Sequence, residues 1–169
     1  MKIKGNVMPL ANKSVFVGGP IQFAICDNGF HEELRTTIQL AIKTVKALNG
    51  NVFSAHLTEK FGIDTPSYTP DMVSKRDFQW MQQCDFFMPI LPVHQGDELL
   101  RTDGTHIELG WASALKRPVL LITQLPIVNG GSHLLKGLEH ICNVSKLDIH
   151  DFRQNPGQIG EIFRNFAVE

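Results

Sequence analysis

Residues 103–116 read DGTHIELGWASALK, and we interpret this stretch as a helix that begins directly after a buried strand. Asp103, Gly104 and Thr105 are short residues of the kind that satisfy the free amides of a first helical turn. Glu108 then falls in that turn, where the helix amides and the positive end of the helix favour an ionised carboxylate. Open α/β folds bind their ligands at this rim of the sheet, so Glu108 is a candidate nucleophile.

The same spacing has a purely structural interpretation. Thr105 and Glu108 fit the capping box, in which the glutamate only folds back onto the backbone amide of the cap residue. Spacing alone favours this cap. The choice between cap and nucleophile therefore depends on the residues that surround the helix.

Length and charge set the class of protein. The chain has 169 residues, 43% of them hydrophobic, and a formal net charge of -1. We expect one domain over residues 14–169, preceded by an N-terminal extension at residues 1–13. The balanced charge gives no electrostatic footprint for a nucleic acid polymer and no basic face for a membrane, so a small molecule is the expected partner.

The three cysteines, Cys26, Cys84 and Cys142, lie far apart and show no metal-ligand spacing. We therefore expect a reduced cytoplasmic protein without a metal site. Glycine and proline interrupt residues 1–13, which do not resemble a signal peptide, and no apolar run is long enough to cross a bilayer.

Short apolar runs alternate with stretches of helical periodicity. The strands are predicted at residues 14–18, 51–56, 85–91, 118–123 and 143–147, and the main helices at residues 32–48, 70–83, 105–116 and 156–167. This alternation predicts an α/β fold, a doubly wound parallel sheet of about five strands with right-handed crossovers and helices on both faces. Pro89 cannot donate to a ladder, so we expect the third strand to be irregular or nearly finished there.

The carboxyl ends of parallel strands meet at one edge of a sheet. Gly19 follows the first strand, and the run from Gly18 lacks the G-x-G-x-x-G spacing of a dinucleotide site. His56 ends the second predicted strand, although a lone histidine is usually hydrogen-bonded filler. Gly19, His56, the end of the third strand and Glu108 should therefore converge at this edge, with residues 58–69 as a loop over them.

Two further features have only weak signals of their own. Asp77 lies within the predicted helix of residues 70–83 and is interpreted from its position as a solvated helix charge. Ser132 ends a loop at residues 126–132 whose Gly-Gly-Ser sequence suits an anion-binding backbone turn.

Several stretches together resemble the nucleoside 2-deoxyribosyltransferase-like N-glycosidases. They are SVFVGGPI from Ser14, SAH ending at His56, RDFQWMQQCDFF from Arg76 and DGTHIELGWASALKRPVLLI from Asp103. The last is the most specific, and its GTHIELGWAS is most similar to nucleoside 5'-monophosphate hydrolases, such as the cytidylate and hydroxymethylcytidylate N-glycosidases.

The resemblance implies a flavodoxin-like (Rossmann-like) single domain, usually dimeric, that cleaves a glycosidic bond without a cofactor. Glu108 matches the nucleophilic glutamate of the family, and Asp77 matches the aspartate that handles the base or protonates it. His56 matches a histidine of the nucleotide hydrolases. Ser132 lies where the family places a residue that reaches into the neighbouring subunit's site and holds the 5' end of the substrate.

One position departs from the nucleotide hydrolases. They tend to carry an arginine after the turn of the first strand, where this chain has Gln22, and glutamine cannot form a bidentate charged clamp on phosphate. Phosphate binding then falls to neutral groups of the site and to one nearby cation. These groups are the amides near Gly19, Pro20, Ile21 and Gln22, together with Thr102, Ser132 of a partner subunit and Arg101. Asp103 is a further candidate for substrate binding.

The leading hypothesis is an N-glycosidase that cleaves a nucleoside 5'-monophosphate with a pyrimidine base to free base and sugar phosphate. A carboxylate beside C1' can trap the sugar while a second acid protonates the base, as in retaining glycosidases. The alternatives are a deoxyribosyltransferase that exchanges two bases, and a nucleotide-binding module without turnover.

Overall fold

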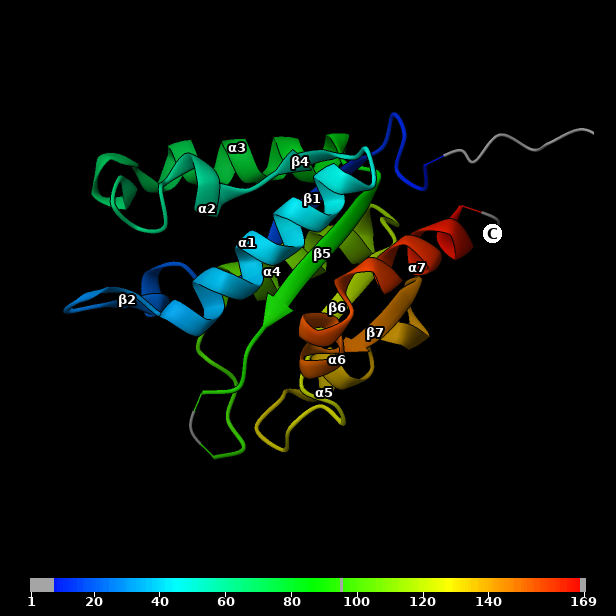
Figure 1. Ribbon diagram of the computed structural model, residues 1–169. Coiled ribbons are helices and arrows are strands. Elements are labelled where there is room, and N and C mark those ends of the chain that lie inside the picture. Colours follow the sequence, from blue (N-terminus) through cyan, green and yellow to red (C-terminus); the bar gives the residue numbers. More distant parts are fainter. Residues whose placement is uncertain (1–7, 95, 168–169) are drawn as a thin grey trace, which may run out of the picture.

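Five strands form one parallel sheet in the computed structural model, which describes residues 8–94 and 96–167. The sheet has the order β4-β1-β5-β6-β7, and the direction of winding reverses between β1 and β5 (Figure 1). The fold is therefore the flavodoxin-like, doubly wound single domain that the sequence predicted. Its strands are β1 Ser14–Gly18, β4 Asn51–Phe53, β5 Phe86–Leu91, β6 Val119–Thr123 and β7 Val144–Asp148.

The main helices confirm the predicted periodicity. They are α1 Glu32–Ala47, α3 Pro70–Gln83, α4 Asp103–Ala114 and α7 Ile159–Phe166, with a 3-10 turn, Pro156–Gln158, before the last. The sequence did not predict the shorter elements. These are the hairpin of β2 Ile25–Cys26 and β3 Gly29–Phe30, the helices α2 Ala55–Thr58, α5 His133–Lys136 and α6 Ile149–Gln154, and the 3-10 turns Gln22–Ala24, Thr65–Ser67 and Leu138–His140.

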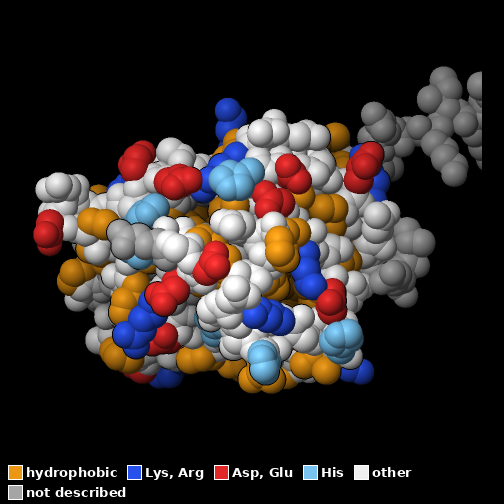
Figure 2. Space-filling view, turned by 90° about the horizontal axis from the view of Figure 1, so that it is seen from below, with side chains coloured by type: hydrophobic (Ala, Val, Ile, Leu, Met, Phe, Trp, Pro, Cys, Tyr) orange, Lys and Arg blue, Asp and Glu red, His pale blue; other side chains and the backbone are white. Residues whose placement is uncertain are grey.

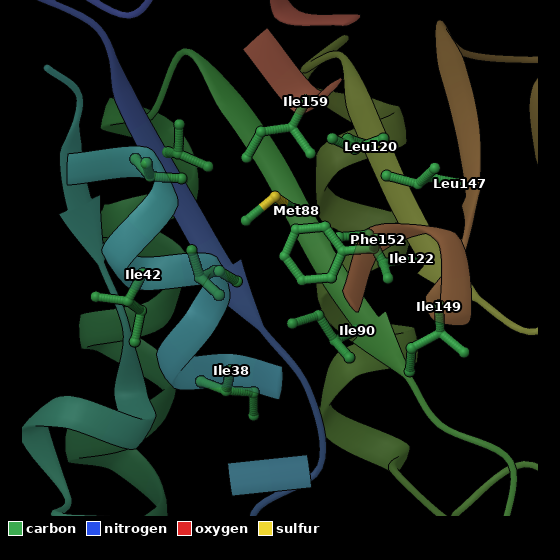
Figure 3. Packing of buried hydrophobic residues seen from close by; sticks show 14 of the residues in the cluster. Ile38, Ile42, Met88, Ile90, Leu120, Ile122, Leu147, Ile149, Phe152 and Ile159 are labelled. Carbon is green, nitrogen blue, oxygen red and sulfur yellow. The ribbon is translucent and has the colours of Figure 1, made fainter. Parts of the chain in front are cut away.

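Successive residues of the strands point to opposite faces of the sheet, so each strand contributes to two cores. On β1, Val15 and Val17 pack beneath α1, while Phe16 packs on the other side beneath α3 and α4. Helices α1, α6 and α7 cover the first core, to which Ile38, Met88 and Phe152 belong (Figure 3). The cavity described below belongs to the second side.

The second strand is shorter than predicted and does not reach His56. β4 ends at Phe53, Ser54 is extended, and α2 begins at Ala55, with the amide of Thr58 donating to the Ser54 carbonyl over 3.2 Å. Ser54 is the residue that precedes α2, although its side chain makes no capping hydrogen bond. His56 consequently lies on a short helix.

Pro89 interrupts β5 without ending it. The strand continues to Leu91 and keeps its register with β1, where Pro89 lies opposite Gly18. On its other side, β5 pairs with β6 at Phe87, Ile90 and Leu91. The strand ends at Leu91, two residues after Pro89, so the prediction that it is nearly finished there is confirmed, and the missing N–H removes only one ladder bond.

The beginning of the described chain packs against the domain. Leu10 is fully buried, and its amide donates to the Leu48 carbonyl over 3.2 Å. Residues 1–7 of the expected extension lie outside the described residues. Cys26, Cys84 and Cys142 are all unpaired. In the described part of the chain, no helix combines the length and apolarity that a membrane span requires.

Candidate functional site

A cavity of about 430 Å³ opens at the carboxyl edge of the sheet. β1 and the loop behind it form its floor, and the start of α4, the inner face of α3 and the loop at residues 58–69 form its walls. The lining of the cavity is mixed in character rather than purely apolar.

Of the 21 lining residues, 14 are polar, charged or aromatic: Phe16, Gln22, Phe23, His56, Glu59, Thr65, Tyr68, Thr69, Ser74, Asp77, Thr102, Asp103, Thr105 and Glu108. The other seven are Gly18, Gly19, Ile21, Ala55, Pro70, Val73 and Gly104.

The structure brings most of the sequence-predicted residues together in this cavity. Those that line it are Gly19, Ile21, Gln22, His56, Asp77, Thr102, Asp103 and Glu108. Pro20, Ser132 and the end of β5 do not line it. The loop at residues 58–69 does border it, through Glu59, Thr65, Tyr68 and Thr69.

The cap of α4 lies three residues earlier than the sequence suggested. Thr102 is the cap residue, and its Oγ1 accepts a hydrogen bond from the amide of Thr105 over 3.4 Å. Glu108 is then the sixth residue of the helix, in its second turn. The capping box between Thr105 and Glu108 is therefore wrong, because a glutamate so far along the helix does not face the cap amide.

The Glu108 carboxyl lies against the end of β1 and is only 9% exposed. A Cβ atom at Gly18 would lie 3.1 Å from Glu108 Oε2 and 2.9 Å from the Phe87 ring, so glycine is needed there to leave room. Burial raises the pKa of Glu108 well above its usual value, and the charge of Asp77 raises it further, against a smaller opposing effect of Arg76. In the empty cavity, burial and the charge of Asp77 therefore oppose the ionised state that the helix start led us to expect.

Asp77 points inward from α3 and is 6% exposed, so its interpretation as a solvated charge was wrong. Its Oδ1 accepts a hydrogen bond from Arg76 Nε over 2.7 Å. Burial raises the pKa of Asp77, Arg76 lowers it, and the charge of Glu59 raises it. Asp77 and Glu108 thus line the same cavity in different surroundings, since Asp77 pairs with the Arg76 guanidinium and Glu108 forms no ion pair with a described residue.

Sequence reasoning missed Glu59 and the role of Arg76. Arg76 Nη2 donates to Glu59 Oε1 over 2.8 Å, and Glu59 is 3% exposed. Glu59 belongs to an irregular loop without periodicity, so nothing in its spacing indicated burial. An acidic residue shortly after a predicted strand end was the only available signal.

His56 is 1% exposed and packs edge-on against the Phe30 ring. Its Nε2 lies 2.9 Å from the Pro20 carbonyl oxygen, and burial lowers its pKa to about 4. The imidazole is therefore neutral at neutral pH, with the Nε2 proton donated to Pro20. His56 thereby fixes the turn that follows β1.

The entrance of the cavity has little free positive charge. Arg101 Nη2 donates to Asp103 Oδ2 over 2.8 Å, and its guanidinium lies 4.3 Å from the centre of the Phe23 ring. The described residues that line the cavity include no lysine or arginine. Acidic, basic and histidine side chains are interspersed on the face seen in Figure 2, without a continuous basic stripe.

Ser132 serves a local purpose within its own chain. Its Oγ accepts a hydrogen bond from the amide of Leu135 over 3.1 Å and caps α5. The amides of Gly130 and Gly131 donate to the carbonyls of Asp97 and Val128. The expected anion-binding turn is therefore already occupied by internal hydrogen bonds.

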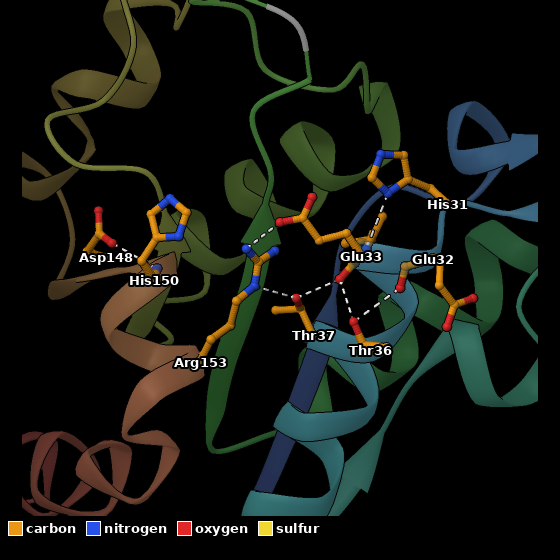
Figure 4. Close-up of polar contacts among 9 residues, drawn as sticks. His31, Glu32, Glu33, Thr36, Thr37, Asp148, His150 and Arg153 are labelled. Atoms are coloured by element: carbon orange, nitrogen blue, oxygen red, sulfur yellow. Dashed lines mark hydrogen bonds and ion pairs between the residues drawn. The ribbon is translucent and has the colours of Figure 1, made fainter.

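A second cavity, of about 260 Å³, lies at the same edge beside α1 and α6. Arg153 donates to Glu33 over 2.6 Å and to Thr37 over 2.9 Å, and His31 accepts from the Leu34 amide (Figure 4). The Glu33 carboxylate of this second cavity is therefore already paired with Arg153. Among the described residues, no group of three or more His, Cys, Asp or Glu side chains is arranged to hold a metal ion.

Comparisons with known proteins support the fold. The sequence matches no protein-family description and no curated protein. Among solved structures, BlsM is 24% identical, with a TM-score of 0.72 and coverage of 90% of each chain. The CMP N-glycosidase BcmB of Clostridium botulinum is 22% identical, with a TM-score of 0.61 and coverage of 89% of this chain and 99% of that one.

A more distant similarity points to the same architecture. A flavo di-iron protein of Thermotoga maritima is 10% identical, with a TM-score of 0.54, and the match covers 96% of this chain and 38% of that one. At such identities, similarity establishes the fold and leaves the chemistry to the site itself.

Proposed function

We propose that this protein is an N-glycosidase that cleaves a nucleoside 5'-monophosphate, with a pyrimidine base, to free base and sugar phosphate. The observation that carries the proposal is the pair of buried carboxyl groups, Asp77 and Glu108, that line one cavity. Two carboxyl groups with different surroundings are what glycoside cleavage requires. A fold shared with a CMP N-glycosidase supports the same assignment.

The start of α4 offers a place for the 5' end of the substrate. The amides of Asp103 and Gly104 lie in the first turn, where they have no acceptor within the helix. Since a helix rises by about 1.5 Å per residue, Thr102 and Glu108 are roughly 9 Å apart along the axis. A sugar phosphate fits this span with C1' beside Glu108 and phosphate at the helix start, held by amides and hydroxyls.

Cleavage requires one proton on the pair of acids. In the empty cavity Glu108 holds that proton more readily, because its pKa is raised well above the usual value. When substrate binds, we place the proton on Asp77 and the negative charge on Glu108, as two coupled acids permit. The C1'–N bond then breaks, the base takes its electrons and the Asp77 proton, and Glu108 bonds to C1'.

Water completes the reaction. Asp77, now a carboxylate, takes a proton from the water that attacks C1', and the bond between Glu108 and the sugar breaks. The free base and the sugar phosphate leave, and the pair of acids again holds one proton. His56 has no proton to give in this scheme, so we assign it the positioning of Pro20 and the turn beside the sugar.

We also propose that the active form is a dimer. Ser132 is exposed and lies outside the cavity of its own chain, next to Leu134, whose side chain is 86% exposed. A partner subunit that covers Leu134 would bring Ser132 towards the 5' end in the neighbouring site. Sedimentation velocity on the purified protein tests this, and a monomer at the assay concentration contradicts it.

The function is tested by incubation with a panel of ribonucleotides, deoxyribonucleotides and their nucleosides. Free base is followed by chromatography. We expect base release from pyrimidine 5'-monophosphates and much less from the matching nucleosides. Release from nucleosides alone would move the substrate to the unphosphorylated class.

A second arm separates hydrolysis from transfer. With an acceptor base present, a hydrolase yields only free base and sugar phosphate, whereas a deoxyribosyltransferase yields a new nucleoside. Binding of a nucleotide without release of base from any substrate in the panel would contradict an enzymatic function.

A further inference from the structure

Asp77 belongs to a chain of side chains that crosses from the loop of residues 58–69 to α3. Thr65 Oγ1 donates to Glu59 Oε2 over 2.6 Å, and Arg76 Nη2 donates to Glu59 Oε1 over 2.8 Å. Arg76 Nε donates to Asp77 Oδ1 over 2.7 Å. Both oxygens of Glu59 are therefore engaged, and one guanidinium bridges two carboxylates.

The pairing of Arg76 with Asp77 does not arise from the helix itself. Consecutive residues of a helix do not face each other, so their side chains meet only if one of them is bent round. The guanidinium carbon of Arg76 lies 4.9 Å from the centre of the Trp80 ring and 5.2 Å from that of Tyr68. The two rings and Glu59 hold the guanidinium in the position where it reaches Asp77.

Burial makes these charges sensitive to each other. The side chains of Glu59 and Asp77 are 4% and 9% exposed, and that of Arg76 is 14% exposed. Little water is present to screen them, so the charge of each carboxylate affects the other. Glu59 offsets part of the charge that Arg76 presents to Asp77.

We propose that Glu59 is a positioning residue for this reaction, which holds Arg76 against Asp77 and keeps Asp77 able to carry the proton for the leaving base. The assignment of that proton rests on the proposed function. The hydrogen-bonded geometry connects the loop over the cavity directly to the acid. Glu59 itself gives no proton and touches no reacting atom.

The test compares Glu59→Gln with the wild type by NMR titration of the Asp77 carboxyl carbon, without nucleotide. The variant keeps the shape of Glu59 and an oxygen that can accept from Arg76 Nη2 but removes the negative charge. Arg76 then stays beside Asp77, so we expect the pKa of Asp77 to fall. Asp64→Asn is the matched control, because it neutralises a carboxylate of the same loop that pairs with Lys60 instead. We expect no change of the Asp77 midpoint in this control.

Kinetics provide a second readout. In Glu59→Gln we expect kcat to fall by about tenfold with little change in KM, below the roughly 10²-fold or greater loss from removal of a general acid. The pH profile of kcat should move in the same direction as the Asp77 midpoint. An unchanged Asp77 midpoint in Glu59→Gln overturns the proposal.

A second variant covers failure of Glu59→Gln to fold. Arg76→Lys keeps the positive charge but loses the planar fork that binds both carboxylates at once. We expect the Asp77 midpoint to rise, and an unchanged midpoint again overturns the proposal. Because the titration needs no substrate, a wild type that releases no base would refute the proposed function while the titration still decides the coupling.

Discussion

The two faces of the sheet differ in what their helices bury. Beneath α1, α6 and α7 the core is apolar, and the buried Thr37 and Thr44 donate to helix carbonyls. On the side of α3 and α4, the chain buries Glu59, Asp77 and Glu108 around a cavity. Burial of carboxyl groups costs free energy that apolar packing would not.

The difference suggests a division of labour. Apolar packing on the first face stabilises the fold. On the opposite face, burial of acids costs free energy and shifts their pKa values. Such shifts are typical of functional sites, although structural ion pairs also produce them. Changes on one face should therefore affect chemistry, and changes on the other should affect folding.

The largest expected effect is on the chemical step. Glu108→Gln keeps the shape of the side chain but removes the nucleophile, so we expect kcat to fall by about 10⁴-fold, equivalent to about 5 kcal/mol. Initial rates of base release measure the loss. Residual activity within tenfold of the wild type would contradict the nucleophilic role.

The same variant has an opposite effect on stability. Because the folded-state pKa of Glu108 is raised, its favourable contribution is complete below the unfolded value near 4.5 and is lost as the pH rises through the folded value. At neutral pH the glutamine variant should therefore melt at a higher temperature than the wild type. A lower melting temperature would contradict the burial of an uncompensated acid.

The next effect concerns the apolar face. Phe163 is fully buried on α7, with its ring centre 4.9 Å from that of Phe86. Phe163→Ala removes this packing, so we expect a loss of about 3–5 kcal/mol of unfolding free energy, measured by urea denaturation. Turnover per folded molecule should remain close to that of the wild type, and a selective loss of turnover would break the division between the faces.

Sequence periodicity predicted the scaffold because strands and amphipathic helices are local patterns. The predicted ranges of β1 and α3 agree with the structure, and the alternation of elements gave the parallel sheet. The same logic brought Glu108 and His56 to one edge, although His56 lies on a helix rather than on a strand.

The electrostatics of the site were not predictable in this way. The contact of Arg76 with Glu59 joins residues 17 positions apart through an irregular loop, which has no repeating pattern. The raised pKa of Glu108 opposes the expectation from the helix start, because spacing does not reveal that this carboxyl is buried and acted on by the charge of Asp77. Long-range packing decides both features.

A smaller effect is expected on the pH dependence of stability, through the protonation of His56. Its pKa is lowered from 6.5 to about 4 by burial, so the folded protein binds fewer protons than the unfolded chain in this range. Stability should therefore decrease as the pH falls from 6.5 towards 4, by about 3 kcal/mol in total. His56→Gln should show a flatter dependence in urea titrations over this range, and an equal slope in both proteins would contradict the prediction.

The smallest effect tests how α4 begins. Thr102 is 6% exposed and caps the helix through its Oγ1, so Thr102→Ala should cost about 1 kcal/mol of unfolding free energy. Thr102→Ser keeps the oxygen and should retain most of that stability. If Thr102→Ala were neutral, the cap would lie elsewhere and Glu108 would return to the first turn. The burial of the Glu108 carboxyl on the side of α3 and α4 would then need a different explanation, because a first-turn glutamate is stabilised by helix amides.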